Sequence, residues 1–241
     1  MESTSGEAAL AGVSNLIEDS AYRNREFVFK DRLQASELLA EKLRLHVAGG
    51  NMQVLAVPAG GVPVGYVVAE KLKIPLDVVV VRKIQVPLNT EAGFGAVTWD
   101  GRVILNERFV AQLGLSEEVV GQCISRTRQI LYERVQRFRG SRRFPDLSGR
   151  TVILVDDGLA SAFSMLAAAG SVKTRYPRKI VIAVPTGSAD AIELLAPTVD
   201  NLVCLNVRSG PIFAVADAYR NWYDLSDDEV LEYLRRIWKG K

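Results

Sequence analysis

Two adjacent carboxylates, Asp156 and Asp157, directly follow an apolar run of strand length at residues 152–155. Four aliphatic residues in a row are typical of a strand that helices cover on both faces, as in the centre of a parallel sheet. Ligands of such sheets bind beyond the carboxyl ends of the strands, where these two acids stand. Acidic residues and glycine also occur where a chain only turns. The residue types alone therefore leave two interpretations, a reactive loop or a simple turn.

Small and hydroxyl-bearing residues follow the acid pair and lead into a predicted helix that contains residues 166–169. The first backbone amides of a helix have no partner within it, and the helix dipole is positive at that end. Such a helix start favours an anion, for example a phosphate group. We therefore expect the amides of residues 161–165 to face an anionic part of a ligand.

A second loop of this kind follows the apolar run at residues 54–57. It contains Ala59, Gly60 and Gly61, and a helix is predicted from about residue 62. Consecutive glycines let the backbone approach a ligand closely, and the helix start again favours an anion. An ordinary glycine-rich turn between a strand and a helix is the alternative interpretation.

Two cations, Arg82 and Lys83, follow four consecutive valines at residues 78–81. The valines predict a third buried strand, which would place both cations at its carboxyl end. Cations there can neutralise a polyphosphate. A solvated strand end would also explain this pair.

The acid loop resembles the donor-binding loop of the type I phosphoribosyltransferases, because an apolar strand, Asp156-Asp157-Gly158, small and hydroxyl residues and a helix follow in that order. The resemblance implies that both acids hold the ribose 2′ and 3′ hydroxyls of phosphoribosyl pyrophosphate and are the catalytic residues. It also implies that residues 160–164 grip the 5′-phosphate, and that loop 59–61, Arg82 and Lys83 face the pyrophosphate.

The family reaction is displacement at the ribose C1 of the donor by a nitrogen nucleophile of an acceptor. The resemblance implies Mg²⁺ as the cofactor, held by Asp156 and Asp157. This ion prefers few protein carboxylates and keeps several waters, so a single acidic pair is enough for it. Aromatic Phe213, near the end of the chain, stacks on a planar base or packs as part of the lid of the core. The candidate substrate-binding residues are therefore Ala59, Gly60, Gly61, Arg82, Lys83, Gly158, Leu159, Ala160, Ser161, Ala162, Phe163, Ser164 and Phe213.

The chain departs from the family pattern in both loops. Ala59 stands where a cation is usual, Ser161-Ala162 replaces Thr-Gly, and Phe163 stands where a small residue is usual. If the glycine position needs a positive φ, Ala162 would cost about 1–2 kcal/mol. The alternatives to an active transferase are therefore a catalytically impaired regulatory or nucleotide-sensing protein of the same fold, and a nucleic-acid-associated protein.

The longest helical pattern begins at Ser116 and carries arginines largely away from its apolar face. This basic face is either a solvated helix surface or an electrostatic guide for phosphate-bearing ligands or nucleic acid. Because the formal net charge is only +2, nucleic acid is the secondary interpretation. The arginines are Arg126, Arg128, Arg134, Arg137 and Arg139.

Strands that alternate with helices through short connections predict an α/β fold with a central, mostly parallel sheet flanked by helices. Residues 1–20 are predicted to be a loose tail, and residues 21–241 a single domain. Within that domain, residues 84–145 are expected to form an insertion: a flexible hood loop, a hairpin turning at Asp100-Gly101 and the long helix. Residues 226–229 have the hydroxyl and acids of a capped helix start.

The bulk composition fits one α/β domain plus a small appendage, since 241 residues are 48% hydrophobic and 24% charged. The longest apolar runs fall far short of the roughly 20 residues that span a bilayer, so no membrane association is expected. Cys123 and Cys204 lie far apart and predict neither a disulfide nor a zinc site. We expect a cytoplasmic protein that forms a homo-oligomer.

Overall fold

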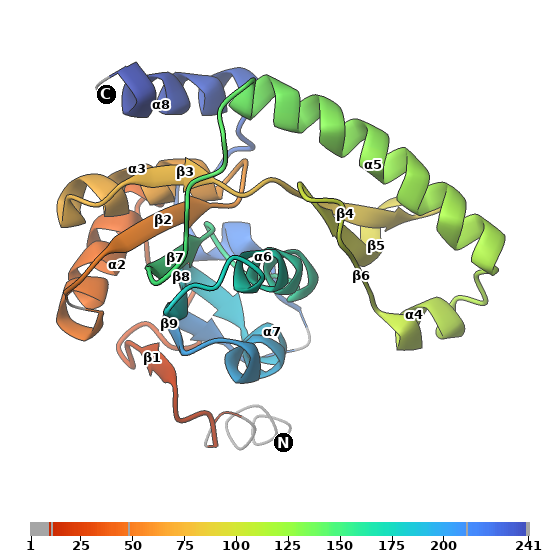
Figure 1. The fold of residues 1–241 in the computed structure, drawn as a ribbon. Coiled ribbons are helices and arrows are strands. Elements are labelled where there is room, and N and C mark those ends of the chain that lie inside the picture. Colours follow the sequence, from red (N-terminus) through yellow and green to blue (C-terminus); the bar gives the residue numbers. More distant parts are fainter. Residues whose placement is uncertain (1–9, 11, 48, 211, 240–241) are drawn as a thin grey trace.

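The central layer of the protein is a six-stranded sheet in which every neighbouring pair of strands is parallel (Figure 1). The computed structural model describes residues 10, 12–47, 49–210 and 212–239. The strand order is β1-β9-β8-β7-β2-β3, so the direction of strand addition reverses between β7 and β2. The strands are β1 (Leu16–Glu18), β2 (Met52–Ala56), β3 (Leu76–Val78), β7 (Thr151–Val155), β8 (Lys179–Ser188) and β9 (Asn201–Arg208).

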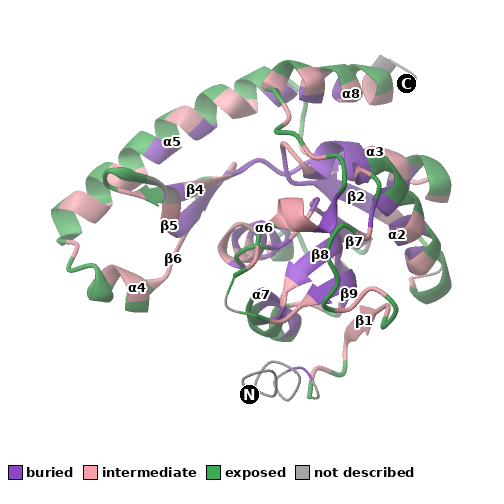
Figure 2. Cartoon of the chain, turned by 180° about the vertical axis from the view of Figure 1, so that it is seen from behind, coloured by how far each residue is buried: buried purple, intermediate pink, exposed green. Residues whose placement is uncertain are grey.

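Helices cover both faces of this sheet. Helices α2 (Arg32–His46) and α3 (Gly61–Leu72) contribute to one cluster of buried residues, and α6 (Phe163–Lys173) and α7 (Ala189–Leu195) to the other. Successive residues of β7 alternate between the clusters, because side chains along a strand point to opposite faces. All the residues of β7 are buried. Figure 2 shows that buried residues gather in the strands at the centre of the molecule. The predicted α/β fold with a parallel sheet buried on both faces is confirmed.

A second, antiparallel sheet forms the hood, in the order β4-β5-β6. Helix α5 runs along the hood and extends to helix α8 of the main body (Figure 1). The hairpin between β5 and β6 turns at Asp100-Gly101 as predicted, and Gly101 has a φ of +85°. The elements are β4 (Val81–Val86), β5 (Asn89–Thr98), β6 (Val103–Leu105), α4 (Glu107–Gln112), α5 (Glu117–Arg139) and α8 (Asp227–Lys239), besides short 3-10 turns η1 (Ala196–Thr198) and η2 (Val215–Ala218).

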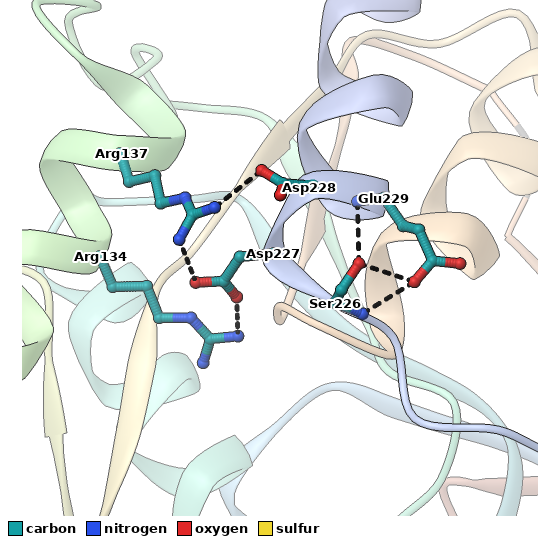
Figure 3. A network of polar contacts seen from close by, with 6 residues as sticks. All are labelled: Arg134, Arg137, Ser226, Asp227, Asp228 and Glu229. Carbon is teal, nitrogen blue, oxygen red and sulfur yellow. Dashed lines mark hydrogen bonds and ion pairs between the residues drawn. The ribbon is translucent and has the colours of Figure 1, made fainter.

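Three of the arginines of α5 are ion-paired and tie this helix to the main body. Arg139 forms a buried ion pair with Asp77, which belongs to β3 in the central sheet. The other two pair with the first turn of α8 (Figure 3): Arg134 with Asp227 at 3.0 Å, and Arg137 with Asp228 at 2.7 Å. These three arginines therefore connect α5 to the main body and are not freely solvated.

Three predictions about the chain path need correction. The four valines do not form one strand: β3 ends at Val78, because its partner β2 ends at Ala56, and the chain then joins the hood as β4. Residues 84–95 are a β4–β5 hairpin with an irregular register, and not a flexible loop. The predicted tail ends earlier than residue 20, since β1 pairs with β9 at the edge of the sheet. The rest of the tail prediction, residues 1–9 and 11, lies outside the described residues.

Both cysteines are free, and Cys204 is buried. In the part of the chain that the structure describes, no helix is both long enough and apolar enough to cross a membrane.

Candidate active site

The two predicted loops touch each other at the point where the strand order reverses. Strands β2 and β7 are neighbours, and the Val57 amide beyond β2 donates to the Val155 carbonyl at the end of β7 (2.9 Å). A Cβ at Gly60 would lie 1.9 Å from Oδ2 of Asp157, and one at Gly61 would lie 2.5 Å from the Val155 carbonyl oxygen. Both glycines are therefore required by the close approach of the loops. Parallel sheets bind ligands at such a switch point.

Asp157 accepts hydrogen bonds from two residues that are distant in the sequence. Its Oδ2 accepts a hydrogen bond from Nε of Arg32 at 2.8 Å, and its backbone carbonyl accepts one from the Tyr219 hydroxyl at 2.5 Å. The Arg32 guanidinium lies 3.8 Å from the centroid of the Trp222 ring and donates through Nη1 to the Tyr223 carbonyl at 2.8 Å. Burial raises the pKa of Asp157, and the charge of Arg32 acts in the opposite direction.

Asp156 is half-buried, and its Oδ1 accepts the amide hydrogen bond of Asp157 at 2.9 Å. Burial, followed by the neighbouring charge of Asp157, raises its pKa well above the ordinary value of a carboxyl. A bound cation would relieve this repulsion between the two carboxylates. The arrangement fits Mg²⁺ carried in with substrate oxygens, because that ion needs only one or two protein carboxylates. Among the described residues there is no cluster of three or more acids, histidines and cysteines that would form a full protein cage.

The helices that begin at the two loops lack a side-chain cap. Helix α6 starts after Ala162 and helix α3 after Gly60, and neither position offers a capping side chain. By contrast α2, α4, α5, α7 and α8 are each capped by a side chain of Asp31, Asn106, Ser116, Ser188 or Ser226. The first amides of α6 are thus left for another acceptor, as an anion-binding helix start requires. Helix α3 differs, because the Gly61 amide donates to the Val57 carbonyl, the Val62 amide donates to the Ala59 carbonyl, and Pro63 has no amide hydrogen. In that loop the amides of Ala59 and Gly60 are the ones without an acceptor among the described residues.

The acid loop departs from its predicted roles at two positions. Leu159 is buried, its amide donates to the Thr186 carbonyl and its carbonyl accepts from the Ser188 amide, so it supports the loop and has no group left for a ligand. Ala162 has a φ of −77°, an ordinary helical value, so the strain expected for a positive φ does not arise. Phe163 and Ser164 are half-buried at the start of α6, and Ala160 and Ser161 are exposed.

Of the two remaining predicted parts of the site, the segment around Phe213 borders the acid loop, whereas Arg82 and Lys83 do not. Phe213 is half-buried in the segment that brings Val215 against Gly158, where a Cβ would lie 2.5 Å from Cγ1 of Val215. That segment therefore borders the acid loop. Arg82 and Lys83 lie in β4 of the hood, where they line a cavity against α5 that includes neither loop. The structure does not bring these cations together with the acid pair.

Sequence reasoning missed Arg32 and Tyr219 as parts of the site. The only available signal was the Asp-Arg pair at the start of a helix, which also describes many ordinary capped helices. Their contact with Asp157 depends on how α2 and η2 pack beside the sheet, and no local pattern reports that.

Comparisons with known proteins identify the family of this chain. A family model described as "Phosphoribosyl transferase domain" matches residues 29–208, about three quarters of the chain. The chain therefore belongs to the phosphoribosyl transferase family.

Two Mycobacterium tuberculosis proteins are each 39% identical to this chain over 210 residues, covering 87% of it. They are named "Putative phosphoribosyl transferase MT0597" (strain CDC 1551 / Oshkosh) and "Putative phosphoribosyl transferase Rv0571c" (strain ATCC 25618 / H37Rv). The match covers 47% of each relative, so this chain spans about half the length of these curated relatives. Among solved structures, TT1426 from Thermus thermophilus is similar with a TM-score of 0.71 and 36% identity, covering 86% of this chain and 98% of that one.

Proposed function

We propose that this protein transfers a phosphoribosyl group from phosphoribosyl pyrophosphate to a nitrogen acceptor. The observation that carries the proposal is the uncapped start of α6 shortly after Asp156 and Asp157, together with the glycine loop before α3, which packs against Asp157. The donor has two phosphate-bearing ends and a diol between them. One anion-binding helix start, one glycine loop with free backbone amides and a carboxylate pair match these three groups.

In this proposal the start of α6 holds the 5′-phosphate, and loop 59–61, through the amides of Ala59 and Gly60, holds the pyrophosphate. Asp156 accepts hydrogen bonds from the ribose hydroxyls, and Arg32 keeps Asp157 ionised and oriented beside it. As the bond between C1 and the pyrophosphate oxygen breaks and the bond to the acceptor nitrogen forms, positive charge develops on the ribose. Nearby carboxylates stabilise that charge, so the chain contributes positioning and electrostatics. Mg²⁺, when bound by Asp156 and Asp157 with the donor, would neutralise charge on the departing pyrophosphate.

Calorimetry with phosphoribosyl pyrophosphate tests this proposal directly. We expect the wild type to bind the donor in the presence of Mg²⁺, and Asp156→Asn to weaken binding by about tenfold or more, since a charge-assisted contact is lost. The matched control is Asp190→Asn, an exposed acid in the first turn of α7, which should bind like the wild type. Pyrophosphate release with a panel of nitrogenous bases then tests turnover. Donor binding that is unaffected by Asp156→Asn would contradict the assigned site.

A nucleotide-sensing role is the second candidate, and the absence of a cationic side chain at Ala59 favours it. Without that charge, loop 58–61 offers a pyrophosphate only backbone amides. A sensor would bind a nucleoside 5′-monophosphate through the acid pair and the start of α6 without consuming any base. Donor binding without release of pyrophosphate from the donor in the presence of any base would support the sensor and reject the transferase.

A further inference from the structure

A cavity of about 580 Å³ lies between the β4–β5 hairpin and helix α5, away from the acid pair. Figure 1 shows α5 running along this part of the hood. Its described lining includes three cations, Arg82 and Lys83 from β4 and Arg126 from α5, and no acidic residue. A cleft lined by charges of one sign concentrates ligands of the opposite sign.

Arg126 differs from the other arginines of its helix. Arg134, Arg137 and Arg139 have carboxylate partners, and Arg128 donates to the Gly101 carbonyl at 3.3 Å. Among the described side chains, Arg126 has no ion pair and is exposed on the cavity side of α5. It is therefore the arginine of this helix that is available to an external anion.

Arg82, on the opposite wall, is also without a carboxylate in ion-pair contact among the described side chains. It is half-buried, and burial lowers its pKa; the nearby charge of Arg134 acts in the same direction, and Asp227 opposes both. A guanidinium that is partly withdrawn from water gains more from an incoming anion than a fully solvated one does.

The remaining walls are suited to the rest of a small organic molecule. Gln122 and Thr127 add polar groups, and Val86, Pro87 and Ile130 add apolar surface. The volume lies within the usual range of small-molecule sites, which combine apolar walls with a few polar anchors.

We propose that this cavity is a second anion site, which binds a small molecule bearing a diphosphate or triphosphate. The site goes beyond the proposed transferase reaction, because its described lining includes neither loop 58–61 nor residues 156–164. Arg82 and Lys83 would then bind phosphate groups, as the sequence predicted, but in the hood cavity and not beside the acid pair.

Calorimetry with inorganic tripolyphosphate, in EDTA and without Mg²⁺, tests this site apart from the acid pair. We expect Arg126→Gln to weaken tripolyphosphate binding by about tenfold. Arg128→Gln, two residues along the same helix, should bind like the wild type. Both arginines are exposed, so thermal unfolding of the variants should match the wild type. ATP as a second probe separates the sources: tighter binding than tripolyphosphate identifies a nucleoside polyphosphate, and equal binding identifies the phosphates as the recognised group.

Two outcomes would overturn the proposal. Tripolyphosphate binding that is unchanged in Arg126→Gln would show that the cavity is not the site. Arg126-dependent retention of single-stranded RNA, with no tripolyphosphate binding, would assign the basic face to nucleic acid. Because this binding is measured without Mg²⁺ and depends on Arg126, which lies outside the acid loop, failure of the transferase proposal leaves the result interpretable.

Discussion

At the scale of single residues, Asp157 belongs both to the interior and to the site. Its carboxylate is largely buried against Gly60 and Arg32, while its neighbour Asp156 is half-exposed. The two adjacent acids therefore have different environments. We infer that Asp156 makes the main contact with a ligand, and that the Arg32–Asp157 pair fixes the loop on which Asp156 stands.

Replacing Arg32 should damage both the fold and the site. Arg32→Gln leaves the largely buried Asp157 carboxylate without its counter-charge, and loss of one partner of a buried pair typically costs about 3–5 kcal/mol. Arg32→Lys keeps the charge but loses the planar contact with Trp222, so it should cost less. Urea denaturation of both variants checks this order. Equal stability of Arg32→Gln and the wild type would mean that the pair does not hold the loop.

At the scale of elements, the start of helix α8 shows a local sequence signal confirmed in structure. Ser226 and Glu229 form a reciprocal capping box: the Glu229 carboxylate accepts from the Ser226 amide (2.9 Å) and hydroxyl (2.8 Å), and the Glu229 amide donates to the Ser226 hydroxyl (3.3 Å) (Figure 3). The same turn carries Asp227 and Asp228, which pair with α5. The cap therefore stabilises the end of α8 that the long helix contacts.

The capping box should make stability depend on pH in a defined direction. Hydrogen bonds from Ser226 lower the pKa of Glu229 below its ordinary value of 4.5. A carboxyl with a lowered folded-state pKa contributes stability that is present above the unfolded pKa and is lost as pH falls through the folded value. Glu229→Gln should thus lower the thermal unfolding midpoint near pH 7, and this difference should shrink below about pH 4.

The matched control is Glu232→Gln, an exposed glutamate of the same helix outside the capping box. It should change the midpoint little at either pH. A Glu229→Gln deficit that stays constant as the pH falls well below the folded pKa of Glu229 would show that the carboxylate's charge is not what the cap uses.

At the scale of the whole molecule, the hood and its long helix are joined to the main body through few polar contacts among the described residues. The most buried of these is the ion pair between Arg139 at the end of α5 and Asp77 of β3, with side-chain exposures of 3% and 9%. Asp77 also accepts the Val78 amide hydrogen bond at 2.7 Å. The pair therefore fixes the end of the long helix where the chain leaves the central sheet for the hood.

Breaking this pair on one side should be worse than removing both charges. Arg139→Met leaves the buried Asp77 carboxylate unpaired and should cost about 3–5 kcal/mol, whereas Arg139→Met with Asp77→Leu should recover much of that loss. Urea denaturation of the two single variants and the double variant measures the coupling. A double variant no more stable than Arg139→Met would show that packing, and not charge, dominates at this contact.

The sequence by itself determined many of the elements and the position of the acid pair at the end of a strand. Apolar runs, the cap at Ser116, the hairpin at Asp100-Gly101 and the capping box at Ser226 depend on neighbouring residues, so local patterns predicted them correctly. It also predicted two loops of the same kind after two strands, and the structure places these strands, β2 and β7, side by side. The family of the chain followed from those loops.

Only the tertiary structure decided which distant groups meet. Arg32 and Asp157 are 125 positions apart, and Arg139 and Asp77 are 62 apart. Their contacts depend on strand order and helix packing, which side-chain periodicity does not encode. The four valines likewise predicted one strand. In the structure β3 stops where its partner β2 ends, and the chain continues as β4, so Arg82 and Lys83 lie in the hood. Local propensity specifies an element, but burial against a partner specifies where it ends and what its side chains reach.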